Sequence, residues 1–381
     1  MTRSRGRHAR RCAPLISGFV VACVTPADGE RCQRAPGRIC TFMGTGQAGA
    51  GDEGQDRLAT ELYLPQDVTV GPDGEVYVLD WNNHRVLTVE SDGTARRLLG
   101  TGEVGDGPDG EARSAAVNHP TNLSVSPGGT LIVAVWHNSK LMEFDPVSGV
   151  VATIAGDGER GFGGDGGPLG AALFDLPVAT AFDPAGNMFI TDQANQRVRR
   201  VDVQGVVQTY VGNGMPGFSG DGGPATDAQI RLPGGESPPP SGRLAVDGAG
   251  NLYLADSDNH RVRKIDPAGT ISTIAGNGDP TFAGDGGPAL EASLARPSDV
   301  AIDSDGNLYI ADTDNSCVWR VDRQGIISTI AGRGLVRGYG GDGAEATEAL
   351  LDHPYGLAVS EDGVLYIADT QNHRIRLVFL E

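Results

Sequence analysis

Histidine is the residue type in this sequence best suited to metal chemistry, and the 381-residue chain contains seven. Three imidazoles on one surface could hold zinc, since catalytic zinc sites use three protein ligands plus a water. His119 and His353 each precede a proline, and His137 follows Trp136. Three others recur at one position of a repeated segment, which points to a structural role: His84, His260 and His373.

Aspartate supplies a second candidate set. One group recurs with an asparagine three residues later, and Asp and Asn commonly bond their own backbone in turns. We therefore interpret this group as a turn device: Asp80, Asp192, Asp256, Asp312 and Asp369, with Asn83, Asn195, Asn259, Asn315 and Asn372. A second group lies in glycine-rich segments, where carboxylates and backbone carbonyls could hold calcium, although each segment supplies only one or two carboxylates: Asp106, Asp165, Asp221, Asp285 and Asp342.

Motifs for covalent catalysis are missing from the sequence. It contains no Gly-x-Ser-x-Gly turn, phosphate loop, Cys-x-x-Cys pair or His-Glu-x-x-His segment. Cys317 stands where other repeats carry arginine, with no recognisable histidine partner, so we interpret it as sequence drift rather than as a nucleophile. No catalytic residue is predicted.

The elements that carry these residues form an internal repeat. Six segments align on anchor residues spaced at about 57 residues: Asp80, Val135, Asp192, Asp256, Asp312 and Asp369. In the fifth unit, apolar runs at 299–302, 307–312, 318–322 and 327–332 are separated by turn sequences. The runs do not alternate strictly, which is typical of strands buried on both faces. The sequence predicts an all-β, six-bladed propeller with four antiparallel strands per blade and inner strands starting near 67, 122, 179, 243, 299 and 356.

The first strand is expected to close the ring. The last unit contains only three apolar runs, and Ile39–Gly44 resembles the missing fourth, as a comparison with Ile271–Gly276 shows. Pairing the two ends of the chain would remove the free sheet edges. Residues 39–381 are therefore predicted to be one domain. Each glycine-rich crossover between blades is expected to contain about one helical turn and to end at a proline.

The repeats resemble the NHL family in the segments LYLADSDNHRV, LYIADTDNSCV and LYIADTQNHRI. The GDGGPA crossovers resemble those of a group of bacterial NHL proteins, many of them predicted to be secreted or lipid-anchored. The resemblance implies the fold, whereas function depends on the site. Related amidating lyases carry metal-binding histidines directly after the inner-strand proline. This sequence carries no histidine there, which weighs against a lyase: Gln66, Thr121, Val178, Gly234, Ser298 and Tyr355.

Residues that interrupt the repeat are the candidates for binding. The loops after the second strands and the crossovers should share one face, which would carry Trp81 and Trp136 on adjacent blades. These tryptophans either form an aromatic contact patch for a partner or pack against the adjacent crossover. The insertion 234–242 is expected to be an exposed loop. The partner-binding candidates are Trp81, Trp136, His137, His119, His353 and Tyr355.

The N-terminal residues indicate export. Five arginines precede a short apolar stretch, 13–22, typical of a secretory signal, and the stretch ends at Cys23 in a sequence resembling the bacterial lipobox. We therefore predict a signal peptide at 1–22, lipidation of Cys23, a linker at 23–38, and a disulfide between Cys32 and Cys40. An ordinary signal peptide or a misassigned start are the alternatives to lipidation.

The net charge of −19 argues against nucleic-acid binding, which requires clustered Lys and Arg. The sequence thus predicts an exported binding scaffold, periplasmic, outer-membrane-anchored or secreted, for a protein or a cell-envelope polysaccharide. The alternative is a channel-centred enzyme, a metal-dependent lyase or lactone hydrolase. No cofactor is expected, with calcium or zinc as the open alternative.

Overall fold

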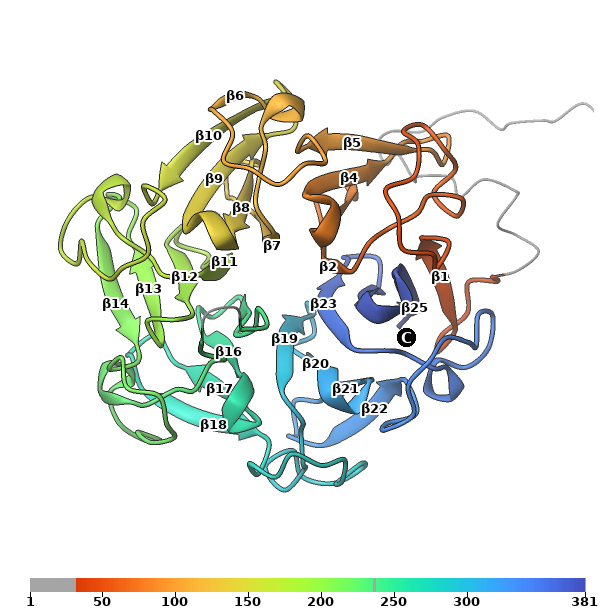
Figure 1. The fold of residues 1–381 in the computed structure, drawn as a ribbon. Helices are drawn as coiled ribbons and strands as arrows, with labels where there is room; N and C mark the ends of the chain where they lie inside the picture. Colours follow the sequence, from red (N-terminus) through yellow and green to blue (C-terminus); the bar gives the residue numbers. More distant parts are fainter. Residues whose placement is uncertain (1–31, 236–237, 381) are drawn as a thin grey trace, which may run out of the picture.

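The computed structural model describes residues 32–235 and 238–380, which form a ring of six antiparallel sheets (Figure 1). The predicted signal peptide and Cys23 lie outside the described residues, as does the start of the predicted linker. Blades 1 to 3 consist of β2 (Pro65–Val70), β3 (Val76–Asp80), β4 (Arg85–Val89) and β5 (Ala95–Leu99); β7 (Pro120–Val125), β8 (Leu131–Val135), β9 (Lys140–Asp145) and β10 (Val150–Ala155); and β11 (Pro177–Phe182), β12 (Met188–Asp192), β13 (Arg197–Val201) and β14 (Val207–Val211).

Blades 4 to 6 follow the same order from the inner to the outer strand. They consist of β15 (Leu244–Val246), β16 (Leu252–Asp256), β17 (Arg261–Ile265) and β18 (Ile271–Ala275); β19 (Pro297–Ile302), β20 (Leu308–Asp312), β21 (Cys317–Val321) and β22 (Ile327–Ala331); and β23 (Pro354–Val359), β24 (Val364–Asp369), β25 (Arg374–Phe379) and β1 (Ile39–Met43). Blade 2 gains a short fifth strand, β6 (Gly110–Glu111), paired with β10. The predicted six-bladed propeller is confirmed.

Strand β1 closes the ring as expected. It pairs antiparallel with β25, with Ile39 opposite Val378 and Thr41 opposite Arg376, and β1 lies beside β25 in Figure 1. Ile39 and Met43 are fully buried. Part of the predicted linker also contacts the last blade, because the backbone N–H of Gly37 donates to the Phe379 carbonyl at 2.8 Å. Among the described residues, no helix is both long and apolar enough to cross a membrane.

Short 3₁₀ turns connect the strands. They occur after second strands at η1 (Trp81–Asn83), η3 (Trp136–Asn138), η6 (Ser257–Asn259), η7 (Thr313–Asn315) and η9 (Thr370–Asn372), and in crossovers at η2 (Ala112–Ser114), η4 (Leu169–Ala171), η5 (Ala225–Asp227) and η8 (Ala346–Glu348). The side chain of the asparagine ending the loop after β3, Asn83, donates to the Gly49 carbonyl of the preceding crossover at 2.8 Å. This contact recurs in four further blades, so these loops and the crossovers do share one face.

Burial explains the strand sequences. Every residue of β3, β8, β12, β16 and β20 is buried, because each second strand is covered on both faces by the neighbouring blades. Continuous apolar runs satisfy this environment better than alternating ones do. The apolar clusters accordingly join residues of adjacent blades rather than of one blade alone.

Candidate functional site

The centre of the ring is filled by one arginine. Arg243, just before β15, reaches across the ring axis from blade 4 toward blade 1. Its Nη1 lies 2.8 Å from Oδ1 of Asp67 in β2 and 3.4 Å from Oδ2 of Asp299 in β19. Its Nη2 donates to the carbonyls of Gln66, at 2.8 Å, and Thr121. Arg243 is only 1% exposed.

The two carboxylates of this network are further satisfied by amide groups. Asp67 accepts hydrogen bonds from the Asn122 side chain at 2.9 Å and the Leu123 backbone N–H at 2.8 Å, and Asp299 accepts from the Leu357 backbone N–H at 2.8 Å. Burial raises the pKa of Asp67 and that of Asp299, the latter to about 7, while the Arg243 guanidinium lowers both. A buried charge network of this kind is tolerated because its members are paired and hydrogen-bonded.

A glycine makes room for the arginine. A Cβ atom added at Gly356 would lie 2.5 Å from Nη1 of Arg243 and 2.6 Å from Oδ1 of Asp67. This network was not predicted from the sequence. The position examined in each inner strand was the one directly after the proline, whereas Asp67 and Asp299 come one residue later. The available signal was a charged residue, Asp67 or Asp299, in the third position of an inner strand whose other residues are uncharged.

The insertion 234–242 is not a simple exposed loop, and that expectation was wrong for its described second half. Pro238, Pro240 and Ser241 are buried. The Gln193 side chain, in the loop after β12, donates to the Pro239 carbonyl and accepts from the Ser241 backbone N–H. In Figure 1 the coloured part of this segment lies near the middle of the ring. It replaces the first residues of the fourth inner strand and delivers Arg243 to the axis.

Three histidines meet where blades 1 and 2 adjoin. The ring centroid of His119 lies 4.5 Å from that of His84, 4.8 Å from that of His137 and 4.6 Å from that of Trp81. His137 stacks on Trp136 at 4.2 Å. The sequence pattern did not group His119 with His84 and His137.

These imidazoles are engaged in the fold. Nδ1 of His84 accepts the backbone N–H of His119 at 3.2 Å, and Nδ1 of His119 lies 3.1 Å from Nδ1 of His137 and 2.7 Å from Oδ1 of Asn118. His260 and His373 accept backbone N–H groups in the same way as His84. Within the described part of the chain, no group of three His, Cys, Asp or Glu side chains has a metal-binding arrangement.

The remaining candidates differ in exposure and in partners. Trp136 is 1% exposed, so packing is its role, one of the two alternatives open from the sequence, while Trp81 remains partly exposed. His353 bonds Asp352 at 2.6 Å, and the Tyr355 carbonyl accepts the Ser298 hydroxyl at 3.0 Å. Cys32 and Cys40 are joined in a disulfide.

His119 should titrate far below an ordinary histidine. Burial, together with the nearby His84 and His137, lowers the pKa of His119 to about 4. Since its unfolded pKa is near 6.5, the unfolded chain binds this proton first, and the free energy of unfolding should fall as pH drops from 6.5 toward 4. NMR titration of the imidazole should show the midpoint near pH 4.

The matched variant is His119→Asn, because asparagine tolerates the left-handed backbone that His119 adopts at φ 52°. The variant should lose stability less steeply than the wild type between pH 6.5 and 4 in denaturant titrations. A wild-type midpoint near 6.5 would contradict the packing of these rings.

The anchor aspartates prove to be buried hubs rather than binding residues. Asp192, for example, accepts the Asp175 backbone N–H at 2.8 Å, the Asn195 side chain at 2.8 Å and Arg199 at 3.4 Å. Burial raises the pKa of Asp192 to about 7, against the lowering effect of these donors. In blade 2 both members of this ion pair are replaced by apolar residues. Val135 stands in place of the anchor aspartate and Met142 in place of the arginine, so no buried charge is left without a partner.

The crossover aspartates bind side chains of the adjoining blade. Four of them form ion pairs of 2.5 to 2.8 Å: Asp106 with Lys140, Asp165 with Arg199, Asp221 with Arg263 and Asp342 with Arg376. Asp285 accepts the Thr329 backbone N–H at 2.9 Å. Cys317 is fully buried, and burial raises the pKa of its thiol, which is unfavourable for a nucleophile.

In blades 3, 4 and 6 an aromatic residue covers the arginine that lies seven residues after the anchor aspartate. It directly follows the crossover carbonyl that the asparagine side chain contacts, and its ring stacks on guanidinium groups. The centroid of Phe218 lies 3.9 Å from Cζ of Arg261 and 4.9 Å from that of Arg263. Phe162 and Tyr339 make the same contacts in blades 3 and 6, and Phe282 stacks on Trp319 at 4.8 Å in blade 5.

Comparison with known proteins agrees with this architecture. A model of the NHL repeat matches residues 62–88 and 351–376, and a model of the teneurin NHL domain matches residues 277–339. The chain is an NHL-repeat β-propeller. It is 30% identical over 284 residues to Protein SUPPRESSOR OF QUENCHING 1, chloroplastic, of Arabidopsis thaliana, covering 71% of this chain and 26% of that protein. It is 27% identical over 347 residues to NHL repeat-containing protein 2 of Gallus gallus, covering 84% of this chain and 47% of that protein.

Solved structures share the fold at low sequence identity. A protein of unknown function from Bacteroides thetaiotaomicron has a TM-score of 0.68 at 18% identity, covering 90% of this chain and 76% of that one. An auxiliary nutrient binding protein from the same organism has a TM-score of 0.65 at 16% identity, covering 89% of this chain and 75% of that one. A gluconolactonase from Xanthomonas campestris has 0.57 at 14%, covering 94% of both chains.

Proposed function

We propose that this propeller is an exported binding scaffold without catalytic activity, which contacts a protein or a cell-envelope polysaccharide. The observation that carries the proposal is the closed centre of the ring. Arg243, Asp67 and Asp299 fill the place where a channel-centred enzyme would admit substrate, and the two carboxylates and both Nη groups of Arg243 are hydrogen-bonded within the fold, although Nε of Arg243 is buried without a partner. A substrate entering the ring would have to break a buried charge network.

The partner surface that we propose is the junction of blades 1 and 2. Trp81 is partly exposed there beside His119 and His137, and partly exposed aromatic rings are frequent anchors at interfaces. A binding role also agrees with the described activity of one solved propeller of the same fold, the nutrient binding protein. Export rests on the N-terminal sequence, and cell fractionation of the full chain would test it.

The enzyme alternative has less support. One propeller of similar fold is a gluconolactonase, but the described residues of this chain contain no group of three His, Cys, Asp or Glu side chains that could hold a metal ion. Calcium or zinc binding stays a hypothesis that elemental analysis of the purified protein would test.

The binding experiment uses purified protein with purified peptidoglycan sacculi, and a cross-linked panel of envelope proteins as the second arm. We expect saturable co-sedimentation with one of them, reduced about tenfold by Trp81→Ala, since a central interface tryptophan is worth about 1–2 kcal/mol or more. Val147→Ala is the control, because Val147 is 95% exposed in a hairpin turn of blade 2. Equal capture by wild type and Trp81→Ala would reject this face.

A further inference from the structure

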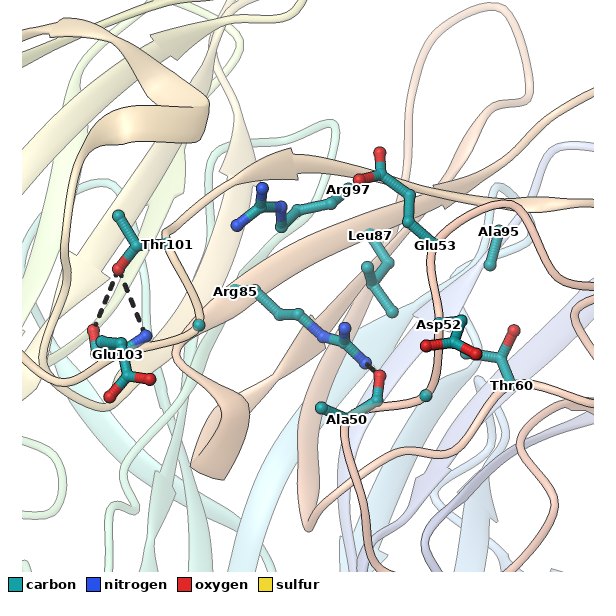
Figure 2. Close-up of a pocket in the computed structure, with 12 residues that line it drawn as sticks. Ala50, Asp52, Glu53, Thr60, Arg85, Leu87, Ala95, Arg97, Thr101 and Glu103 are labelled. Atoms are coloured by element: carbon teal, nitrogen blue, oxygen red, sulfur yellow. Dashed lines mark hydrogen bonds between the residues drawn. The ribbon is translucent and has the colours of Figure 1, made fainter.

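The structure contains a cavity of about 320 Å³ at blade 1, lined among others by Ala50, Leu87, Arg97, Asp52 and Glu103 (Figure 2). Its volume is within the range of small-molecule sites. None of the lining residues belongs to the proposed partner surface, so the inference goes beyond the proposed function.

The cavity lies where the repeated aromatic-on-arginine contact is missing. Ala50 follows the carbonyl of Gly49, which the Asn83 side chain contacts, and therefore stands where other blades carry Phe162, Phe218, Phe282 or Tyr339. Leu87 follows the anchor Asp80 by seven residues and stands where blades 3, 4 and 6 carry arginine. In blade 1 both large groups are thus replaced by smaller ones at the same place, where the cavity lies.

The other blades show what fits such a space. In blade 4 the Phe218 ring lies over the guanidinium of Arg261 at 3.9 Å. Blade 1 retains the equivalent arginine, Arg85, which is 8% exposed and bonds Asp80 at 2.8 Å and the Ala50 carbonyl. A ring supplied by a ligand would find the same cation and the apolar side chain of Leu87 beneath it.

The charged groups of the rim are complementary to a zwitterion. Arg97 replaces the threonine of the other blades, donates to the Gly100 carbonyl at 2.8 Å, and forms no ion pair within the described residues. The exposed carboxylates of Asp52 and Glu103 likewise have no cationic partner there, whereas Glu53 is paired with Arg113 at 2.6 Å. In Figure 2 the guanidinium of Arg97 points in a different direction from that of Arg85, which reaches the Ala50 carbonyl.

We propose that this cavity binds a small aromatic zwitterion of the amino-acid class. The aromatic ring occupies the space left by Ala50 and Leu87, the carboxylate pairs with Arg97, and the ammonium group lies toward Asp52 or Glu103.

The test is binding of free L-phenylalanine to the intact protein, followed by NMR or calorimetry. A ligand of this size should bind with a Kd on the order of 1 mM or tighter. Phenylpropionate, which lacks the ammonium, and phenethylamine, which lacks the carboxylate, should each bind about tenfold more weakly.

Variants that rebuild the repeat provide the decisive comparison. Ala50→Phe with Leu87→Arg restores the groups of the other blades and should abolish binding while the protein remains folded, and Arg97→Thr should weaken binding about tenfold. Ala185→Phe, at an exposed turn of blade 3, is the matched control and should bind as the wild type does. No saturable binding by the wild type, or unchanged binding by the folded Ala50→Phe/Leu87→Arg variant, would overturn the proposal. Neither outcome depends on the partner surface at Trp81.

Discussion

Replacing Arg243 by methionine is expected to lower the free energy of unfolding by about 3–5 kcal/mol, the cost of leaving buried charges without their partner. Asp67 and Asp299 would then face each other at the ring axis with no cation between them. Both carboxylates should take up protons more readily, since Arg243 lowers the pKa of each more than any of their hydrogen-bond donors does. Denaturant unfolding at pH 7 measures the loss.

The pH dependence separates this mechanism from a simple loss of packing. For a carboxyl whose folded pKa lies above the unfolded value near 3.8, stability is fully present below 3.8 and is lost as pH rises through the folded pKa. The Arg243→Met variant should therefore recover part of its stability between pH 7 and 5.

Two further variants control the Arg243 experiment. Arg333→Met, at an exposed position, should change stability by less than about 0.5 kcal/mol. Adding Asp67→Asn and Asp299→Asn to Arg243→Met should restore stability relative to the single variant, because the uncompensated charges are removed. If Arg243→Met were as stable as the wild type at pH 7, Arg243 would not be the group that compensates the buried charges of Asp67 and Asp299.

Removing the closing strand is the second change with a large expected effect. A chain that starts at Thr45 lacks β1 and should lose at least about 3–6 kcal/mol, the contribution of burying Ile39 and Met43 alone. Strand β25 would become a free edge, which favours association with other chains. Thermal unfolding and size-exclusion chromatography should show a lower transition temperature and aggregates.

The control for the strand deletion is a chain starting at Cys32, which retains β1 and should unfold as the full chain does. A synthetic peptide covering residues 35–46 should also rescue the shortened chain by adding the missing strand. A shortened chain that stays monomeric with an unchanged transition temperature would show that β1 does not seal the ring.

Much of the fold could be predicted because local patterns repeat. The anchor spacing defines the blades, and in the fifth unit the expected strands differ from the observed ones by no more than two residues at either end. The closing strand was predictable because Ile39–Gly44 resembles the outer strand of another unit. Pairing between the two ends then follows from closure of the ring.

The candidate site was predictable only in part. Trp136 was a plausible surface residue in the sequence, yet it is 1% exposed because it packs beside His137 and the next blade. The cluster of His84, His119 and His137 combines residues from two blades whose sequence positions gave no sign of contact. Likewise, Ala50 and Leu87 are unremarkable alone, and they indicate a cavity only once the positions they share with other blades are known.

The sequence by itself determined the propeller, its six blades and the way that its ends join, since these depend on hydrophobic periodicity and turn chemistry within each repeat. Only the tertiary structure decided what occupies the centre, because Arg243, Asp67 and Asp299 come from three blades and up to 232 residues separate them along the chain. A contact across the axis is set by where the inner strands converge, and no local pattern encodes that distance.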